Sequence, residues 1–378
     1  MKLLIVTNIP TPYRIAFFNV LHAQLQKIGG DLKVLYCAKS EPDRHWEINL
    51  NEQQFDYEIL NGFHKSIKGL HLHFNPSVLN KTAAFQPDYI LYAGSWNMPT
   101  VVFSLLFNSL FNKKYKKVFW SEGHDGSMLH QSGIVPKIRN FIQNKFDAFA
   151  VPNERSKSYL FEVLGLKKKP IAILPNTVEG TFFTKPETWN IENSNAIKSE
   201  FNIPVDSKII IQVSQIEDRK GINEIVEFWT QLKNKENYHL ILVGEGSLKT
   251  ELIQKTKSDT TIHFLGNQSK EKVRSLLFAS DIFVLLTKND PNPLTLIESS
   301  YAKLPILTTK FAGNCNEIIV GNNGFVINEI NFDTFDKAFE KMKVFANQNN
   351  GEISFQNVNQ NFDIKNVACK LIEQLQNI

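Results

Sequence analysis

The chain has 378 residues, of which 42% are hydrophobic and 21% charged, and its formal net charge is +4. That length is too great for one ordinary core, so we expect a globular protein of two domains. No run of about 18 apolar residues is present, which argues against a membrane-spanning helix, and three widely spaced cysteines (Cys37, Cys315, Cys369) argue against a disulfide framework and favour a reducing, cytoplasmic setting.

The charge is unevenly distributed along the chain. Residues 1–190 hold 22 basic and 15 acidic residues, whereas the remainder holds 20 and 23. A basic first half suggests an anionic partner, for which nucleic acid, a membrane surface and a phosphorylated lipid are all suitable. Solvated surface lysines explain the same numbers equally well.

The first half of the chain alternates short apolar runs with longer helical patterns. The opening "KLLIVTN" is typical of a buried strand rather than a signal peptide. Strands bounded by helices of this length favour a parallel, doubly wound sheet. The predicted strands cover residues 2–8, 32–38, 88–94, 117–123, 148–152 and 171–176.

The same pattern then restarts, which predicts a second Rossmann-like domain. The strands expected there cover 207–215, 238–246, 261–267, 281–287, 304–309 and 323–328. A polar stretch near 176–206 is the expected hinge, and a cleft between the two domains is the expected ligand site. A final amphipathic helix follows. We therefore divide the chain into residues 1–178, 179–361 and a C-terminal helix over 362–378.

Several common catalytic motifs are missing from the sequence. No G-x-G-x-x-G follows a strand, and there is no G-x-x-x-x-G-K-[ST] and no G-x-S-x-G, which argues against a dinucleotide dehydrogenase, a P-loop ATPase and an α/β-hydrolase. Neither a D-x-D nor a C-x-x-C or H-E-x-x-H spacing is present, so no metal ligand is predicted.

Phosphate-binding features gather in the second half. Lys220 in "VSQIEDRKG" lies between a strand and a helix, where a lysine neutralises phosphates, although an ordinary loop lysine fits as well. The glycines of "VGEG" (243–246) permit close backbone approach and also suit a plain turn.

The stretch "KNDPNPLTLIESSYAKLP" (288–305) predicts an anion site at a helix start. Pro293 suits the first helical turn, and the amides of Asn292, Leu294 and Thr295 are then free to bind an anion. Glu298 shares a helix face with Leu294 and Thr295. Asp290 and Glu298 can therefore lie on either side of a diphosphate, although a partly exposed helix glutamate is an equally simple reading of Glu298.

Taken together, these spacings resemble the E-x7-E signature of retaining family 4 (group 1) glycosyltransferases. The family's sequence pattern "E-P-F-G-L-x-x-x-E-A-x-A-x-G-x-P-V" corresponds in this chain to "DPNPLTLIESSYAKLPI". "VSQIEDRKG" resembles the family's "V-G-R-L-x-x-x-K-G", and "LVGEGSLKTEL" resembles its "VGDGPLxxxL". The similarity covers most of residues 148–378, including the terminal "FDIKNVACKLIEQL", and is weak before them.

The resemblance implies a GT-B fold, in which two Rossmann-like, doubly wound domains face each other across a cleft. It implies a retaining, metal-independent transferase that uses a nucleoside-diphosphate sugar, with UDP or GDP as the nucleotide, and no cofactor. In this role Glu298 would bind the ribose, Asp290 the donor sugar and Lys220 the diphosphate. The remaining donor-binding candidates are Gln215, Arg219, Gly244, Leu265, Gly266, Asn292, Leu294 and Thr295.

Two departures from the family pattern concern the donor. The family's arginine in "V-G-R-L" is Gln215 here, which removes a positive charge from the diphosphate, and Arg219 is the nearest arginine in the sequence. The first acid is Asp290 rather than glutamate. Two alternatives therefore stay open: a nucleotide-sugar-binding protein without transferase activity, and a nucleotide-sugar epimerase of the same fold.

The first half is expected to bind the acceptor, a glycan or a polyisoprenyl-diphosphate-linked sugar of bacterial surface polysaccharide synthesis, rather than nucleic acid. The acceptor-binding candidates are Tyr13, Arg14, Trp96 and Asn97, and the catalytic candidates there are Glu122 and His124. The apolar and lysine-rich stretch 103–120 suggests docking on an anionic membrane at the inner face of the cell membrane, and a buried helix followed by a lysine turn explains it equally well.

Overall fold

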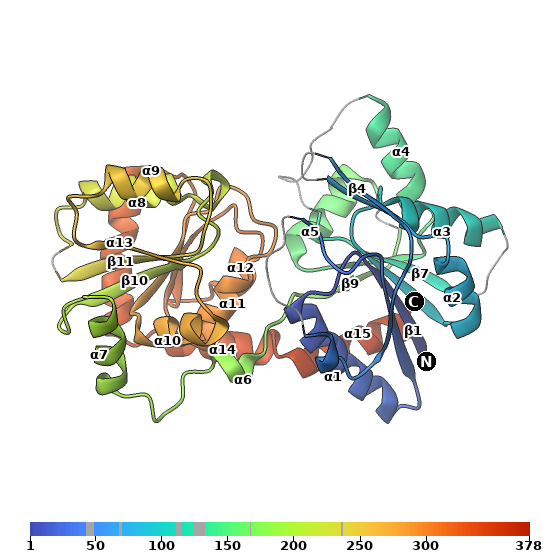
Figure 1. The fold of residues 1–378 in the computed structure, drawn as a ribbon, viewed down its shortest axis with the longest axis horizontal. Helices are drawn as coiled ribbons and strands as arrows, with labels where there is room; N and C mark the ends of the chain where they lie inside the picture. The colour runs from blue at the N-terminus through green and yellow to red at the C-terminus, as the bar shows by residue number, and fades with distance from the viewer. Residues whose placement is uncertain (43–48, 68–69, 111–114, 124–132, 167, 236) are drawn as a thin grey trace. The chain divides into compact units, whose positions relative to one another are not determined.

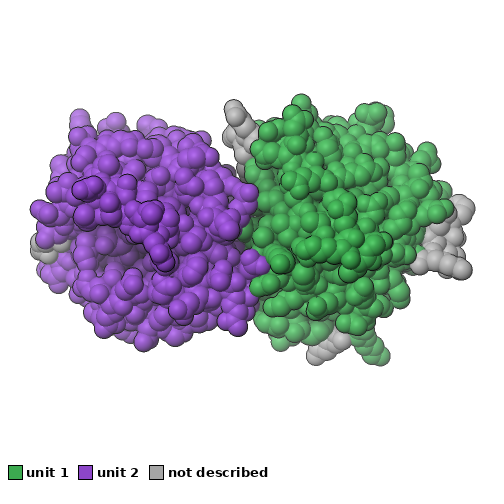
Figure 2. Space-filling model, turned by 90° about the horizontal axis from the view of Figure 1, so that it is seen from below, with its two compact units in different colours: residues 1–178, 364–378 green, residues 179–363 purple. Residues whose placement is uncertain are grey.

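The computed structural model describes residues 1–42, 49–67, 70–110, 115–123, 133–166, 168–235 and 237–378. The chain divides into two compact units, shown in different colours in Figure 2. Unit 1 contains residues 1–178 together with 364–378, and unit 2 contains residues 179–363. The chain therefore leaves unit 1 after Val178 and returns to it at Ile364 with its last helix.

Unit 1 is built on a parallel sheet with the strand order β3-β2-β1-β6-β7-β8-β9 (Figure 1). Its strands are β1 (Lys2–Thr7), β2 (Asp31–Tyr36), β3 (Asp56–Ile59), β6 (Tyr89–Ala93), β7 (Lys116–Trp120), β8 (Ala148–Val151) and β9 (Ile171–Ile173). Because β1 pairs with β2 on one side and β6 on the other, the order of the strands reverses beside β1. Ligands of such sheets bind outside the carboxyl ends of the strands at that point.

Helices cover both faces of the first sheet. They are α1 (Pro12–Lys27), α2 (Val78–Phe85), α3 (Pro99–Leu110), α4 (Ile134–Gln143), α5 (Glu154–Ser158) and α15 (Ile364–Gln376). Side chains of α1 and α15 pack together against one face, where Leu3 and Ile5 point, and those of α2, α3 and α4 pack against the other, where Leu4 and Val6 point. This alternation is the two-residue period of a strand buried on both faces.

Unit 2 repeats the plan with the strand order β12-β11-β10-β13-β14-β15. Its strands are β10 (Lys208–Val213), β11 (Tyr238–Val243), β12 (Ile262–Gly266), β13 (Ile282–Leu285), β14 (Ile306–Thr309) and β15 (Gly324–Ile327). All the pairings are parallel. The order of the strands reverses at β10, which lies between β11 and β13.

The helices of unit 2 again lie on both faces of its sheet. They are α6 (Gly180–Phe183), α7 (Ile191–Glu200), α8 (Ile222–Gln231), α9 (Lys249–Lys255), α10 (Lys270–Ala279), α11 (Leu294–Tyr301), α12 (Cys315–Ile318), α13 (Phe332–Asn347) and α14 (Gly351–Asn361). The buried core beneath α8 and α13 includes Trp229, Phe335 and Phe339. A short 3-10 turn over Asp218–Lys220 precedes α8.

The strands predicted from sequence are confirmed in both sheets, each to within a few residues at its ends. The amphipathic stripe of the last helix is also confirmed, since Val367, Ala368 and Leu371 are buried in the core of unit 1. Sequence reasoning missed β3, which lies at the edge of its sheet and alternates polar and apolar side chains over only four residues. It also missed β4 (Phe63–Ile67), which forms an antiparallel hairpin with β5 (Leu70–Phe74).

A histidine pair between β11 and β12 should make unit 2 sensitive to acid. His239 and His263 stack with their ring nitrogens Nδ1 and Nε2 2.8 Å apart. Burial, with the nearby His239, lowers the pKa of His263 from 6.5 to about 4. At this residue the unfolded chain binds a proton more tightly than the folded chain does. The folded state therefore has its full stability above pH 6.5 and loses up to about 3 kcal/mol of it as the pH falls towards 4.

Chemical unfolding between pH 7.5 and pH 5 measures this effect. The unaltered protein should lose stability steeply over that range, whereas a His263→Asn variant should lose less because its side chain does not titrate. Equal pH slopes for the two proteins would show that His263 does not carry the effect.

Candidate functional site

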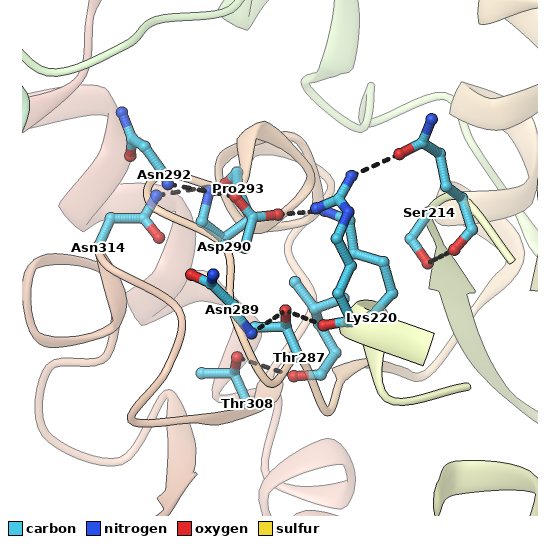
Figure 3. Close-up of polar contacts among 12 residues, drawn as sticks. Ser214, Lys220, Thr287, Asn289, Asp290, Asn292, Pro293, Thr308 and Asn314 are labelled. Carbon is cyan, nitrogen blue, oxygen red and sulfur yellow. Dashed lines mark hydrogen bonds and ion pairs between the residues drawn. The ribbon is translucent and has the colours of Figure 1, made fainter. Parts of the chain in front are cut away.

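Two loops meet at the carboxyl ends of β10 and β13, where the strand order of unit 2 reverses. The loop after β10 carries Lys220, and the loop after β13 carries Asp290. Their side chains form an ion pair in which Lys220 Nζ donates to Asp290 Oδ2 (Figure 3). The side chains are only 13% and 11% exposed, so the pair is largely removed from water. The structure thus joins two residues that lie 70 positions apart in the sequence.

Backbone contacts hold Lys220 in place. The side chain of Gln212, fully buried in β10, donates to the Lys220 carbonyl oxygen at 3.0 Å. Gly221 has a φ of +69°, and a Cβ there would lie 1.9 Å from the carbonyl oxygen of Leu286. Only glycine tolerates both the left-handed conformation and this close approach. The turn that presents Lys220 is therefore fastened directly to the strand that leads to Asp290.

The ionisation of Lys220 reflects this environment. Burial lowers the pKa of the Lys220 ammonium from its usual value, and Asp290 opposes that effect. A buried ammonium depends on its partner to stay charged. That partner is Asp290, so each charge neutralises the other. The separate roles expected for the two residues, with the diphosphate for Lys220 and the donor sugar for Asp290, stay predictions.

The start of α11 lies beside this ion pair and differs from the sequence prediction in two details. Pro293 is the residue before the helix, with extended backbone (φ −63°, ψ 115°), rather than part of the first turn. The amide of Asn292 is not free, because it donates to Asp290 Oδ1 at 3.2 Å (Figure 3). The first helical amides, of Leu294 and Thr295, remain as donors because the opening amides of a helix have no partner within it.

A segment that sequence reasoning overlooked supports this helix start. Asn314 Nδ2 donates to the Pro293 carbonyl oxygen at 3.2 Å, and the Gly313 amide donates to the Asp290 carbonyl oxygen at 2.8 Å. A Cβ on Gly313 would lie 2.0 Å from the carbonyl oxygen of Pro291. The glycine signalled a tight approach in the sequence, but its partner could be found only in the folded chain.

Glu298 lies one turn into α11. It is half-buried, as are Leu294 and Thr295, whereas Leu296 and Ile297 are buried, so the expected shared face of the first three is confirmed. Burial raises the pKa of the Glu298 carboxyl from 4.5 to about 7, and Lys270 opposes the shift only in part. A carboxyl with this pKa exchanges its proton near neutral pH and is poised to respond to a ligand.

The glycine-rich strand ends form a close-packed edge next to the loop after β10. The Gly244 amide donates to the Gly266 carbonyl oxygen at 2.9 Å. Gly244 has a φ of +136°, and a Cβ there would lie 2.0 Å from the Ser214 carbonyl oxygen. The Leu265 carbonyl oxygen accepts from the Gln268 side chain at 2.7 Å. The structure therefore brings Gly244 and Gly266 together.

Gln215 and Arg219 are also brought together. Arg219 Nη2 donates to Gln215 Oε1 at 2.5 Å, and both side chains are exposed. Both residues lie in the loop and turn that lead from β10 to Lys220. The arginine therefore points back towards the position at which the family pattern has its arginine.

A second polar group lies in unit 1. Arg14 at the start of α1 donates to Thr7 Oγ1 at 2.8 Å and forms an ion pair with Glu122, which follows β7, at 3.4 Å. The Asn176 side chain donates to Glu122 at 3.2 Å. The guanidinium lies 4.8 Å from the Trp120 ring centre and 5.8 Å from that of Tyr13. Three of the acceptor-side candidates, Tyr13, Arg14 and Glu122, are thus assembled.

A cavity of about 280 Å³ opens beside Glu122. Trp96 lines it, and so do Arg139 and Gln143 from α4, which sequence reasoning missed. Arg139 is buried and lies 5.5 Å from the Trp96 ring centre. Asn97 is not among its described lining residues and accepts from Ser95 at 2.5 Å, and His124 lies outside the described residues. Arg139 could not be found from the sequence, because a basic residue in a short helix gives no signal that it will be buried.

The membrane-docking prediction remains untested. In the described part of the chain, no helix is both long and apolar enough to span a bilayer. Lys113 and Lys114 lie outside the described residues, and Lys117 forms an ion pair with Asp147 at 3.8 Å. Among the residues that the structure places, no cluster of three His, Cys, Asp or Glu side chains could hold a metal ion.

Comparison with known proteins identifies the fold and the family. Residues 193–345, which include the ion pair and α11, match the family model "Glycosyl transferases group 1". This segment of unit 2 belongs to the group 1 glycosyltransferases. This confirms the group predicted from sequence, while the assignment to family 4 stays a prediction.

Curated relatives of this chain are distant. N-acetyl-alpha-D-glucosaminyl L-malate synthase of Bacillus anthracis is 23% identical over 68% of this chain and 70% of that protein. The lipopolysaccharide core biosynthesis glycosyltransferase LpsE of Rhizobium meliloti is 24% identical over 38% of this chain and 42% of that protein. The latter match thus spans less than half of the relative's length.

Solved structures show the fold of this chain along its whole length. Anabaena Alr3699/HepE in complex with UDP has a TM-score of 0.77 at 13% identity and covers 100% of both chains. A glycosyltransferase from Rickettsia africae also has a TM-score of 0.77, at 16% identity, over 100% of this chain and 98% of the other. The predicted GT-B fold, with its two Rossmann-like units, is confirmed.

Proposed function

We propose that this group 1 glycosyltransferase is a retaining enzyme that moves a sugar from a nucleoside-diphosphate sugar to a glycan or lipid-linked acceptor in bacterial surface polysaccharide synthesis. The observation that carries the proposal is the Lys220–Asp290 ion pair at the start of α11, at the point where the strand order of unit 2 reverses. A relative named for lipopolysaccharide core biosynthesis, and a structural neighbour solved in complex with UDP, support the substrate classes.

The proposed donor chemistry follows from charge. When the bond between the anomeric carbon and the diphosphate oxygen breaks, its electron pair stays on the diphosphate. Lys220 and the first amides of α11 then stabilise the added negative charge, while Asp290 turns from the lysine to a hydroxyl of the donor sugar. The acceptor hydroxyl bonds to the anomeric carbon on the same face and gives its proton to the leaving phosphate.

Glu298 is the proposed ribose anchor. A ribose offers two neighbouring hydroxyl donors, and an ionised carboxylate accepts both. Because burial holds the pKa of Glu298 at about 7, the free protein is only partly ionised there at neutral pH. Donor binding therefore draws the proton off Glu298.

Unit 1 is the proposed acceptor-binding unit. Its cavity beside Glu122 is walled by Trp96, and aromatic rings of this kind pack against the apolar face of a sugar. Tyr13, Arg14 and Glu122 form the polar group next to it. Tyr13 and Arg14 stay candidates for acceptor binding, and Glu122 stays a candidate for catalysis.

The proposal is tested by offering the purified protein UDP-, GDP- and dTDP-sugars with sugar-lipid acceptors. Thermal-shift screening should first identify one nucleotide that raises Tm, because a ligand that binds the folded state stabilises it. That donor should then release nucleoside diphosphate in an acceptor-dependent way, with the same rate in EDTA. Binding without turnover on any acceptor would contradict the transferase assignment and favour a nucleotide-sugar-binding protein.

A further inference from the structure

We propose that Arg219, held by Gln215, is the second cation of the diphosphate site. This inference rests on the proposed function and adds to it a residue that stands outside the family pattern. The pattern has an arginine at the position of Gln215. In this chain the positive charge has moved four residues along to Arg219, and the neutral amide at 215 keeps it in place.

The first support is the charge balance around the loops at the carboxyl ends of β10, β11 and β13. Lys220 faces Asp290, Lys249 faces Glu245 at 2.6 Å, and Lys288 contacts both Asp218 and Glu224 at 2.7 Å. Among the described residues, the Arg219 side chain instead donates to the neutral Gln215 oxygen. Because Lys220 is already engaged by a carboxylate, a second cation strengthens the attraction for the negatively charged diphosphate.

The second support is the fixed backbone of Arg219. Its carbonyl oxygen accepts from the Lys288 amide at 2.9 Å and from Thr287 Oγ1 at 2.9 Å, and the Asn289 amide also approaches, at 3.4 Å. These donors belong to the loop that ends at Asp290. The loop that carries Arg219 is thereby bound to the loop that carries the first acid of the site, and Lys220 follows directly.

The third support is the tether on the side chain. An exposed arginine normally samples many rotamers, and holding it in one place costs conformational entropy. The Gln215 amide oxygen accepts one guanidinium N–H and leaves the other donors of the fork available. A guanidinium offers two parallel N–H groups to a phosphate, so the tethered side chain is prepared for that contact. Gln215 is accordingly a positioning residue.

The test compares four proteins: the unaltered chain, Arg219→Gln, Gln215→Arg/Arg219→Gln, and Lys343→Gln. The double variant exchanges the two residues and so returns the arginine to the family position while keeping a partner for it. Lys343→Gln removes one surface charge from α13 of the same unit and serves as the matched control.

Affinity is measured by calorimetry for the nucleoside diphosphate that stabilises the protein most and, by competition, for the corresponding nucleoside. Arg219→Gln should weaken binding of the nucleoside diphosphate about 5- to 20-fold. The affinity for the nucleoside and the Tm of the protein without ligand should be unchanged. The exchange variant should recover most of the loss, and Lys343→Gln should behave as the unaltered chain. A merely structural role for Arg219 would lower Tm or weaken both ligands equally, which would overturn the proposal.

The binding data distinguish the role of Arg219 from the proposed function of the protein. If the unaltered protein binds a nucleoside diphosphate but Arg219→Gln binds it equally well, the role of Arg219 is wrong and the proposed function stands. If the unaltered protein binds no nucleoside diphosphate of the panel, both are overturned. Failure of the exchange variant to recover affinity would overturn the charge-relocation argument.

Discussion

Lys220→Met should lower kcat for sugar transfer by about 10²- to 10³-fold, the usual cost of removing one group that stabilises charge in the transition state. The lysine ammonium is largely shielded from water, so its attraction for the leaving diphosphate is weakly screened. The loss should fall mainly on kcat, because the charge on the diphosphate grows as the bond to the sugar breaks. Initial rates of nucleoside diphosphate release, with donor and acceptor varied, measure it.

Stability needs a separate control, because Lys220→Met leaves the Asp290 carboxylate buried without its partner. Breaking a buried pair in this way costs about 3–5 kcal/mol. The double variant Lys220→Met/Asp290→Asn removes both charges, so it should regain stability while staying inactive. Lys235→Met, which breaks the 2.7 Å pair with Asp259 in the loops before β11 and β12, should remain active. A fully active double variant would contradict the role of Lys220.

Donor affinity should weaken about tenfold between pH 8 and pH 6 in the unaltered protein. The raised pKa of Glu298, about 7, means that below neutral pH the carboxyl must lose its proton before it accepts from the ribose hydroxyls. Each pH unit below that value then costs up to about 1.4 kcal/mol of binding free energy. The measurement should use an intact nucleotide sugar, because its bridged diphosphate has no terminal phosphate that titrates in this range.

Glu298→Gln separates this effect from other titrations. The variant should bind the nucleotide sugar more weakly at pH 8, and its affinity should be nearly independent of pH. Without ligand it should be more stable than the unaltered protein at pH 8, by about 1–2 kcal/mol. A buried carboxyl with a raised pKa contributes its stability below pH 4.5 and loses it as the pH rises through about 7. An unchanged pH slope in the variant would exclude Glu298 as the ribose anchor.

The structure also shows what Asp290 and Gln215, the two departures from the family pattern, contact. Asp290 is shorter than glutamate by one methylene, yet it reaches Lys220 because glycine at 221 brings that turn against Leu286. Gln215 carries no charge but contacts Arg219. The doubt that Gln215 raised about transfer therefore becomes a question that the exchange variant can answer.

Local patterning was enough to predict most of the fold from the amino-acid sequence. Strands buried on both faces are continuous apolar runs, and their alternation with helices dictates parallel sheets, so both sheets and the amphipathic stripe of α15 could be predicted. The short edge strand β3 was not predicted, because an exposed edge strand has few apolar residues to indicate it. Candidate donor residues were found because spacings such as that between Asp290 and Glu298 are local.

Contacts between distant segments were decided only by the tertiary structure. The pairing of Lys220 with Asp290, the support of the α11 start by Asn314, and the cavity that joins Trp96 to Arg139 each depend on which strands become neighbours in a sheet. The raised pKa of Glu298 has the same origin, since it depends on burial that exists only in the folded chain. Residue type and spacing determined which groups could act in this protein, and strand order determined which of them meet.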